Sequence, residues 1–119
     1  MKGPVLGRLA DVVDGGSAGF VAETEEGRVG LLVIRRGDQL FAYVNRCPHI
    51  GAPLDFRPGQ FLTRDGAHIL CANHGALFRI EDGYCITGPC ARQSLTPVDI
   101  RIDGDRIVLA GPPPVSPGF

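Results

Sequence analysis

Residues 47–78 read CPHIGAPLDFRPGQFLTRDGAHILCANHGALF. The stretch begins with Cys47-Pro48-His49 and closes near Cys71-Ala72-Asn73-His74, so each motif holds one thiol and one imidazole two or three positions apart. Two sulfur and two nitrogen ligands suit either tetrahedral zinc or an iron–sulfur centre. We therefore predict that the two motifs form one metal site.

The division of the ligands between the motifs bears on which metal they hold. Zinc sites with two Cys and two His usually place both Cys in one short motif and both His in the other. Here each motif has one of each, so two adjacent loops could direct their thiolates to one metal and their imidazoles to a neighbouring one. A binuclear [2Fe–2S] centre in which two His replace two Cys on one iron has that requirement. A structural zinc module remains the alternative.

At these residues the chain resembles the Rieske [2Fe–2S] family, whose signature is C-x-H, a spacer and C-x-x-H. The spacer here has 21 residues, 50–70. Gly51, Gly75 and the pair Gly88-Pro89 also fall where the family has them, and the resemblance covers roughly residues 31–109. It implies a [2Fe–2S] cluster whose inner iron is held by Cys47 and Cys71 and whose outer iron is held by His49 and His74.

The residues around the expected cluster indicate its surroundings. Gly51 and Gly75 each follow a ligand closely, and a residue without Cβ lets the backbone approach a cluster. The resemblance implies that Gly88-Pro89 is the family's proline loop, which covers the cluster and brings Cys90 close without making it a ligand.

Two positions that carry hydroxyl groups in respiratory relatives are apolar here. Those relatives have Ser and Tyr where this chain has Ala76 and Phe78. Fewer hydrogen bonds to a cluster that becomes anionic make reduction harder, so we expect a potential near the low end of the Rieske range, about −150 mV. The same relatives bridge their ligand loops with two extra Cys, where this chain has Ala52 and Asn73. The resemblance is therefore to the oxygenase-associated ferredoxin type.

Composition and charge bound the protein class. A length of 119 residues fits one domain, here a single Rieske domain over 1–119. A formal net charge of −1 gives no reason to expect nucleic acid. No apolar run approaches the ~20 residues that span a bilayer, and the N-terminus lacks the features of a signal peptide, so we expect no membrane contact and a cytoplasmic protein. Oligomeric state is left open.

Short alternating or β-branched runs separated by Gly, Pro and Asp predict an all-β protein, a sandwich or small barrel. The resemblance implies a basal antiparallel β domain with a small cluster-binding β subdomain inserted at about 45–80. Residues 111–119 form a Pro-rich tail. The expected strands are Val5–Val13, Phe20–Thr24, Val29–Arg35, Leu40–Asn45, Phe61–Thr63, Ala67–Ala72, Leu77–Ile80, Tyr84–Ile86, Val98–Ile102 and Arg106–Leu109.

The pattern favours a one-electron carrier that is not itself an enzyme, because a second metal site would need ligands beyond His68, which we expect to be a surface or hydrogen-bonded residue. The resemblance implies a flavin-dependent reductase upstream and an oxygenase or other redox enzyme downstream. The alternative is a non-catalytic subunit like the small subunit of assimilatory nitrite reductase. Cys85 and Cys90 are expected to be packing thiols. Residues 45–79 carry a net charge of +2, which could steer an acidic partner or be a plain solvated surface.

Overall fold

The computed structural model describes residues 5–24, 27–47, 53–55, 57, 59–72, 75–88 and 92–110. Within them, nine strands form three antiparallel sheets of three strands, ordered β1-β9-β8, β2-β3-β4 and β5-β6-β7. The all-β prediction is confirmed. The elements are β1 (Val5–Arg8), the 3₁₀ turn η1 (Leu9–Asp11), β2 (Ser17–Thr24), β3 (Gly27–Arg36), β4 (Gln39–Val44), β5 (His68–Leu70), β6 (Leu77–Arg79), β7 (Cys85–Thr87), β8 (Ile100–Asp103) and β9 (Arg106–Leu109).

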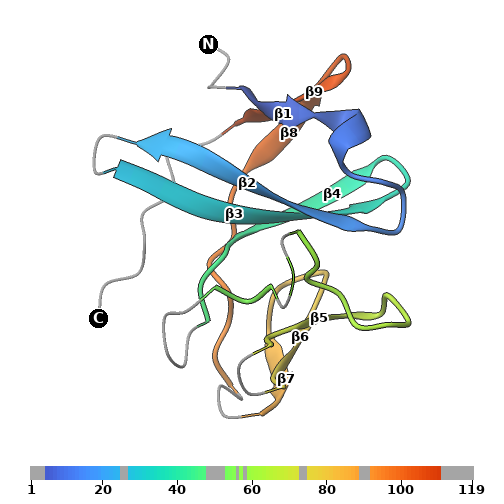
Figure 1. Ribbon diagram of the computed structural model, residues 1–119, viewed down its shortest axis with the longest axis vertical. Coiled ribbons are helices and arrows are strands. Elements are labelled where there is room, and N and C mark those ends of the chain that lie inside the picture. Colours follow the sequence, from blue (N-terminus) through green and yellow to red (C-terminus); the bar gives the residue numbers. More distant parts are fainter. Residues whose placement is uncertain are drawn as a thin grey trace.

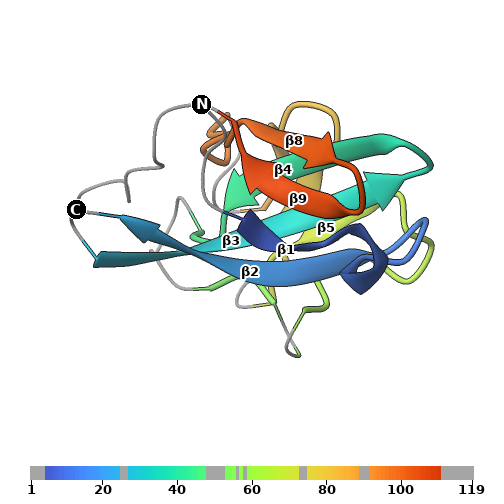
Figure 2. The same cartoon turned by 90° about the horizontal axis from the view of Figure 1, so that it is seen from above.

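The sheet β2-β3-β4 is the middle layer of the molecule. Figure 1 shows it between the β1-β9-β8 sheet above and the β5-β6-β7 sheet below, and Figure 2 shows the upper sheet lying across it. Leu31 and Val33 of β3 pack into the core shared with the upper sheet, whereas Leu32 and Ile34 pack into the core shared with the lower sheet. Successive side chains of a strand point to opposite faces, so an uninterrupted apolar run is what a strand between two cores requires.

Tyr43 of β4 joins the middle layer to the lower sheet. Its side chain is 3% exposed, and its hydroxyl donates to the Ile80 carbonyl at 2.6 Å. A Cβ on Gly83 would lie 2.8 Å from the Tyr43 ring, so the turn between β6 and β7 lies directly against that ring. Burial raises the pKa of Tyr43 to about 12, with Asp82 and Glu81 adding to the rise. The phenol therefore stays a neutral hydrogen-bond donor at physiological pH.

Several strand boundaries differ from the sequence-based expectation for local reasons. The first strand stops at Arg8 instead of reaching Val13, because the Asp11 carboxylate accepts the Arg8 N–H at 2.9 Å and begins η1. Residues 61–63 form only an isolated bridge, from Leu62 to Ile69, instead of a strand. The Phe61 N–H donates to the Ser17 hydroxyl. Val98 donates to the Ala42 carbonyl of β4 at 3.0 Å, so β8 begins only afterwards.

Two strands of the lower sheet come from the region expected to bind the cluster. β5 and β6 lie within the expected subdomain of residues 45–80, and β7 extends the sheet to Thr87. The expected turns at Gly37, Gly66, Gly83 and Gly104 all have positive φ, between 61° and 74°. Among the described residues, no helix has the length and apolar character needed to cross a bilayer.

Candidate metal centre

The first motif follows the end of β4, and its cysteine packs into the core shared with the lower sheet. β4 ends at Val44, and the backbone N–H of Arg46 donates to the Val44 carbonyl at 2.9 Å. This tight turn leaves the Cys47 side chain only 1% exposed, within the core shared with the lower sheet. The end of the strand therefore directs the first thiol inward.

The second motif forms a closed loop between β5 and β6. The Cys71 N–H donates to the Ala76 carbonyl at 2.9 Å, and the Gly75 N–H donates to the Cys71 carbonyl at 2.9 Å. Gly75 has a φ of +69°, which the turn needs and glycine adopts without strain. Among the described residues, no atom lies within 4 Å of the position of a Cβ on Gly75. Cys71 itself is completely buried.

Gly88, the residue directly after β7, packs against Ala76 at the end of this loop. A Cβ placed on Gly88 would lie 2.7 Å from the Ala76 Cα and 2.9 Å from the Ala76 Cβ. Real Cβ atoms essentially never approach other atoms so closely, and the φ of +103° at Gly88 also disfavours any side chain. Glycine is therefore required at position 88 for the chain to lie against Ala76 directly after β7. Pro89, the other residue of the expected proline loop, lies outside the described residues.

The chemical surroundings of the two thiols are apolar. Cys47 and Cys71 belong to one buried cluster together with Leu54, Ala76 and Phe78. Ala76 is 1% exposed and Phe78 fully buried, so the two positions that lack hydroxyl groups are interior positions. No polar or charged side chain is buried among the described residues. If these two side chains bind a metal as thiolates, the positive charge of the metal offsets the cost of burying them, because an isolated buried charge is strongly unfavourable.

Other predicted site residues lie outside the described part of the chain: His49, Gly51, Ala52, Asn73, His74, Pro89 and Cys90. Within the described part, no group of three or more His, Cys, Asp or Glu side chains is placed to hold a metal ion. His68 lies on β5, half-buried, and its backbone N–H donates to the Thr63 hydroxyl at 3.2 Å. Cys85 is buried, and its Sγ donates to the Thr87 carbonyl at 3.2 Å. Its packing position fits the role expected for it.

One residue just before the first motif, Asn45, was not expected from the sequence to take part in the site. Its side-chain oxygen accepts the Leu54 N–H at 2.8 Å, and its side-chain nitrogen donates to Asp55 at 3.3 Å. The available signal was the residue type: Asn readily bonds nearby backbone and is unusual in a strand interior. Asn45 therefore holds together the two ends of the segment that carries Cys47.

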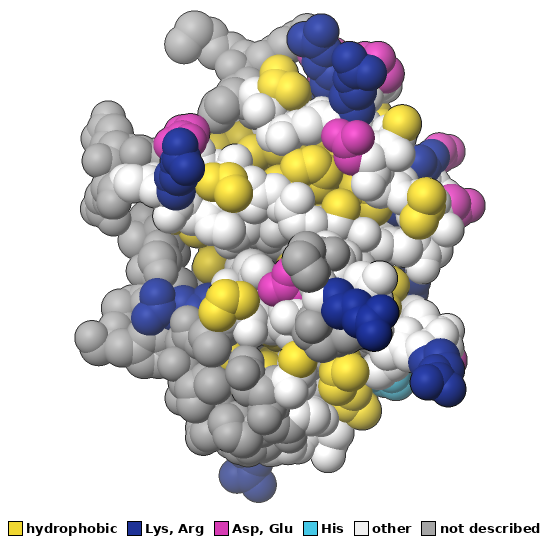
Figure 3. Space-filling view, in the orientation of Figure 1, with side chains coloured by type: hydrophobic (Ala, Val, Ile, Leu, Met, Phe, Trp, Pro, Cys, Tyr) yellow, Lys and Arg dark blue, Asp and Glu magenta, His cyan; other side chains and the backbone are white. Residues whose placement is uncertain are grey.

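Charges around the lower sheet are partly paired. Arg36 contacts Glu81 at 2.6 Å and lowers the pKa of that carboxyl, and Arg79 does the same for Asp82. Figure 3 shows dark-blue side chains spread over the lower half of one face, with little magenta among them. Three arginines of this region have no ion pair within the described residues: Arg57, Arg64 and Arg92.

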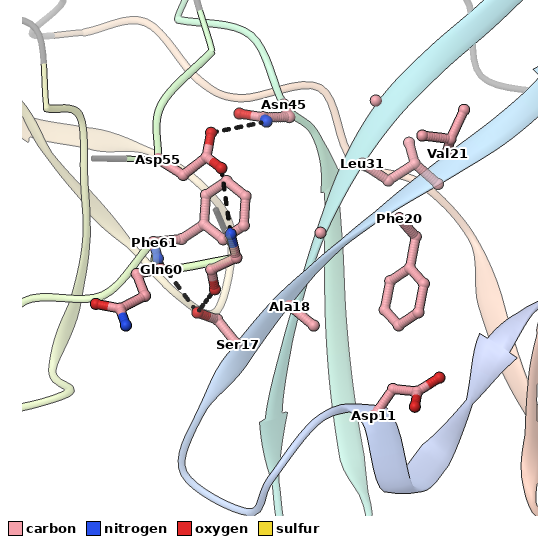
Figure 4. A pocket seen from close by; sticks show the side chains of 13 residues that line it. Asp11, Ser17, Ala18, Phe20, Val21, Leu31, Asn45, Asp55, Gln60 and Phe61 are labelled. Atoms are coloured by element: carbon pink, nitrogen blue, oxygen red, sulfur yellow. Dashed lines mark hydrogen bonds between the residues drawn. The ribbon is translucent and has the colours of Figure 1, made fainter. Parts of the chain in front are cut away.

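A shallow groove lies where the middle layer meets residues 55–61. Its volume is about 670 Å³, and it is widely open to solvent. β2 and β3 supply one wall, including Phe20 and Leu31, and Asp55 and Phe61 lie on the other (Figure 4). Neither Cys47 nor Cys71 is among the described residues that line it.

Comparison with known proteins places this arrangement in a family. The family model described as the Rieske [2Fe–2S] domain matches residues 5–109. That family binds a [2Fe–2S] cluster, as the resemblance implied. No curated protein sequence gives a significant match.

Several solved structures share the fold. The ferredoxin of carbazole 1,9a-dioxygenase from Nocardioides aromaticivorans is 22% identical, with a TM-score of 0.69 over 92% of this chain and 98% of that one. A Sphingomonas yanoikuyae ferredoxin is 24% identical, with a TM-score of 0.73 over 92% and 99%. A chain from the complex of reduced oxygenase and oxidized ferredoxin in carbazole 1,9a-dioxygenase is 24% identical, with a TM-score of 0.70 over 94% and 95%. At these identities the likeness establishes the fold.

Proposed function

The chain belongs to the Rieske [2Fe–2S] family, and we propose that it is a one-electron carrier of the ferredoxin type. The observation that carries the proposal is the burial of Cys47 and Cys71 in one apolar core, each at the end of a strand. Support also comes from the structural neighbours named as ferredoxins, because this chain aligns with nearly their whole length. When bound, the cluster would accept and release a single electron.

We propose that Cys47 and Cys71 hold the inner iron and that His49 and His74 hold the outer one. The donor chemistry fits such a group, because Cys thiolates hold iron–sulfur clusters and an iron pair would offset the cost of burying their charge. Each motif supplies one Cys and one His, which matches a centre with unlike ligands on its two irons. Backbone bonds that close residues 71–76 would fix the second pair of ligands relative to each other.

We also propose a potential toward the low end of the Rieske range. Ala76 and Phe78 are buried and offer no hydroxyl donor. Hydrogen bonds to the cluster sulfurs stabilise the more negative reduced state, and their absence leaves it less stable. A low potential suits delivery of electrons to an oxygenase rather than withdrawal of electrons from a quinol.

A flavin-dependent reductase and an oxygenase or similar redox enzyme are the proposed partners. The structural neighbour from carbazole 1,9a-dioxygenase was solved as a complex of oxygenase and ferredoxin, which supports an oxygenase for this chain too. The arginines without ion pairs would favour an acidic partner surface through electrostatic steering. Such steering weakens as ionic strength rises.

The test of this function is an electron-relay assay. Anaerobically purified protein is mixed with NADH, a flavin-dependent reductase from a ring-hydroxylating oxygenase system, and cytochrome c as final acceptor. We expect cytochrome reduction to increase in proportion to the loaded protein and not to increase with the C47S variant. A wild-type protein that contains iron but relays no electrons from any such reductase would overturn the carrier proposal. A colourless protein containing zinc would overturn the cluster itself.

A further inference from the structure

We infer that Asn45 is a positioning residue that sets the separation of the two ligand loops. The inference rests on the proposed function and on the ligand set proposed above. Asn45 is two residues before Cys47, and its own backbone N–H is fixed to the Gly30 carbonyl of β3 at 2.8 Å. It therefore joins a rigid strand to the start of the first loop.

The side chain of Asn45 reaches the far end of that loop. Its oxygen accepts the N–H of Leu54 at 2.8 Å. Leu54 is completely buried, so its N–H has little access to water and depends on this partner. The bond closes residues 45–54 into a ring that contains Cys47.

Leu54 carries the connection on to the second loop. The Ala72 N–H donates to the Leu54 carbonyl at 3.0 Å, and Ala72 directly follows Cys71. The N–H of Leu54 thus donates to the Asn45 side chain, and the carbonyl of Leu54 accepts from the second motif. The hydrogen bonds from Asn45 through Leu54 to Ala72 therefore link a residue two positions before Cys47 to the residue directly after Cys71.

Asp55 holds the Asn45 amide in the required orientation. One carboxylate oxygen accepts from the Asn45 amide nitrogen at 3.3 Å, and the other accepts the Gly59 N–H at 3.3 Å. The network ends at Ser17 of β2, which donates to the Gly59 carbonyl at 2.9 Å and accepts the Phe61 N–H at 3.2 Å (Figure 4). The amide accepts from Leu54 through its oxygen and donates to Asp55 through its nitrogen, whereas an ionised carboxylate could only accept.

Loss of this link should affect the cluster more than the fold. Residues that orient metal ligands through hydrogen bonds change metal affinity about 10–100-fold when they are replaced. We expect N45A to increase the first-order rate of cluster loss to an excess of chelator about 10–100-fold. The reduction potential should also shift, and the electron paramagnetic resonance lines should broaden as the ligand geometry becomes less uniform.

Tyr43→Phe is the matched control. The Tyr43 hydroxyl also makes a hydrogen bond at a buried position, but to the Ile80 carbonyl and not to the ligand loops or to the Asn45 network. We expect Y43F to change the rate of cluster loss by less than about threefold and to leave the potential unchanged. If both variants lower the thermal transition alike and lose cluster at equal rates, Asn45 is merely structural and the inference is wrong.

A swap variant keeps the inference testable if N45A does not fold. N45D keeps the acceptor for the Leu54 N–H but removes the donor and places two carboxylates together. N45D/D55N restores one amide and one carboxylate in exchanged positions. We expect N45D to lose cluster rapidly and the swap to return the rate and the potential to near wild type. Equal behaviour of N45D and the swap would refute the role, whereas a wild-type protein without a [2Fe–2S] cluster would refute the proposed function instead.

Discussion

The contact between Gly88 and Ala76 predicts that Gly88→Ala is strongly destabilising. A Cβ there would lie 2.7 Å from the Ala76 Cα and 3.3 Å from its N, whereas carbon atoms in contact are ordinarily about 3.5–4.0 Å apart. Forcing the two segments apart costs about 1–3 kcal/mol, as overpacking does. The φ of +103° adds about 1–3 kcal/mol of backbone strain for a residue with a side chain. We expect a total near 4 kcal/mol.

Gly104→Ala separates the two contributions. Gly104 has a φ of +63°, in the turn between β8 and β9, and nothing lies within 4 Å of its Cβ position. This variant carries backbone strain alone, and we expect it to cost about 1 kcal/mol. A double variant, A76G/G88A, removes the Cβ contact but not the contact with the Ala76 Cα. It should recover only part of the loss.

Urea titration of the loaded, anaerobic proteins measures these differences at equal incubation time by far-ultraviolet circular dichroism. With a slope of about 1.5 kcal/mol per molar urea, G88A should move the midpoint down by about 2–3 M and G104A by less than about 1 M. Equal midpoints for the two glycine variants would show that Gly88 does not lie against Ala76, and the placement of the chain directly after β7 would be wrong.

Three further predictions concern hydroxyl groups. Ala76→Ser should raise the reduction potential by about 40–90 mV, which corresponds to about 1–2 kcal/mol of preferential hydrogen bonding to the reduced cluster, and a potentiometric titration showing no change would contradict the loop placement. Phe78→Tyr should raise the potential if its hydroxyl reaches the cluster, and unchanged potential with lower stability would mean that the new hydroxyl is buried without a partner. Tyr43→Phe should cost about 1–3 kcal/mol in urea titration, because the buried Ile80 carbonyl loses its donor. Because the folded pKa of Tyr43 is raised from 10.0 to about 12, wild-type stability should be full below pH 10 and fall as pH rises toward 12, and this fall should be weaker in Y43F.

Much of the fold could be predicted from local pattern. The apolar run of β3 and the turn at Gly37 predict a hairpin, which the register Arg36↔Gln39 confirms. The apolar run does not reveal that Leu31 and Leu32 pack into different cores, because a strand that is apolar on both faces carries no polar residues to show which face points to which core. That division depends on the two other sheets, which assemble from distant parts of the chain.

The candidate site could be predicted only in part. Spacing predicts Cys47 and Cys71 as ligands and the structure buries both, while the ligand roles of these cysteines and of the paired histidines stay predictions. Asn45 is placed by pattern as the last residue of a strand. Its partners Leu54 and Asp55 lie nine and ten residues away across a segment without regular structure, so no periodicity points to them. Contacts closed by irregular loops depend on tertiary packing rather than on local preference.

We propose that two thiolates and two imidazoles hold one [2Fe–2S] cluster. Pulsed electron paramagnetic resonance of the dithionite-reduced, anaerobically purified protein is the decisive test, because it detects ¹⁴N nuclei coupled to the unpaired electron. We predict a rhombic signal of low average g value, with strong coupling to two imidazole nitrogens and with one coupling lost in each of H49C and H74C. A reduced iron-loaded protein with no strongly coupled nitrogen, or with both couplings retained in either variant, would contradict the assignment.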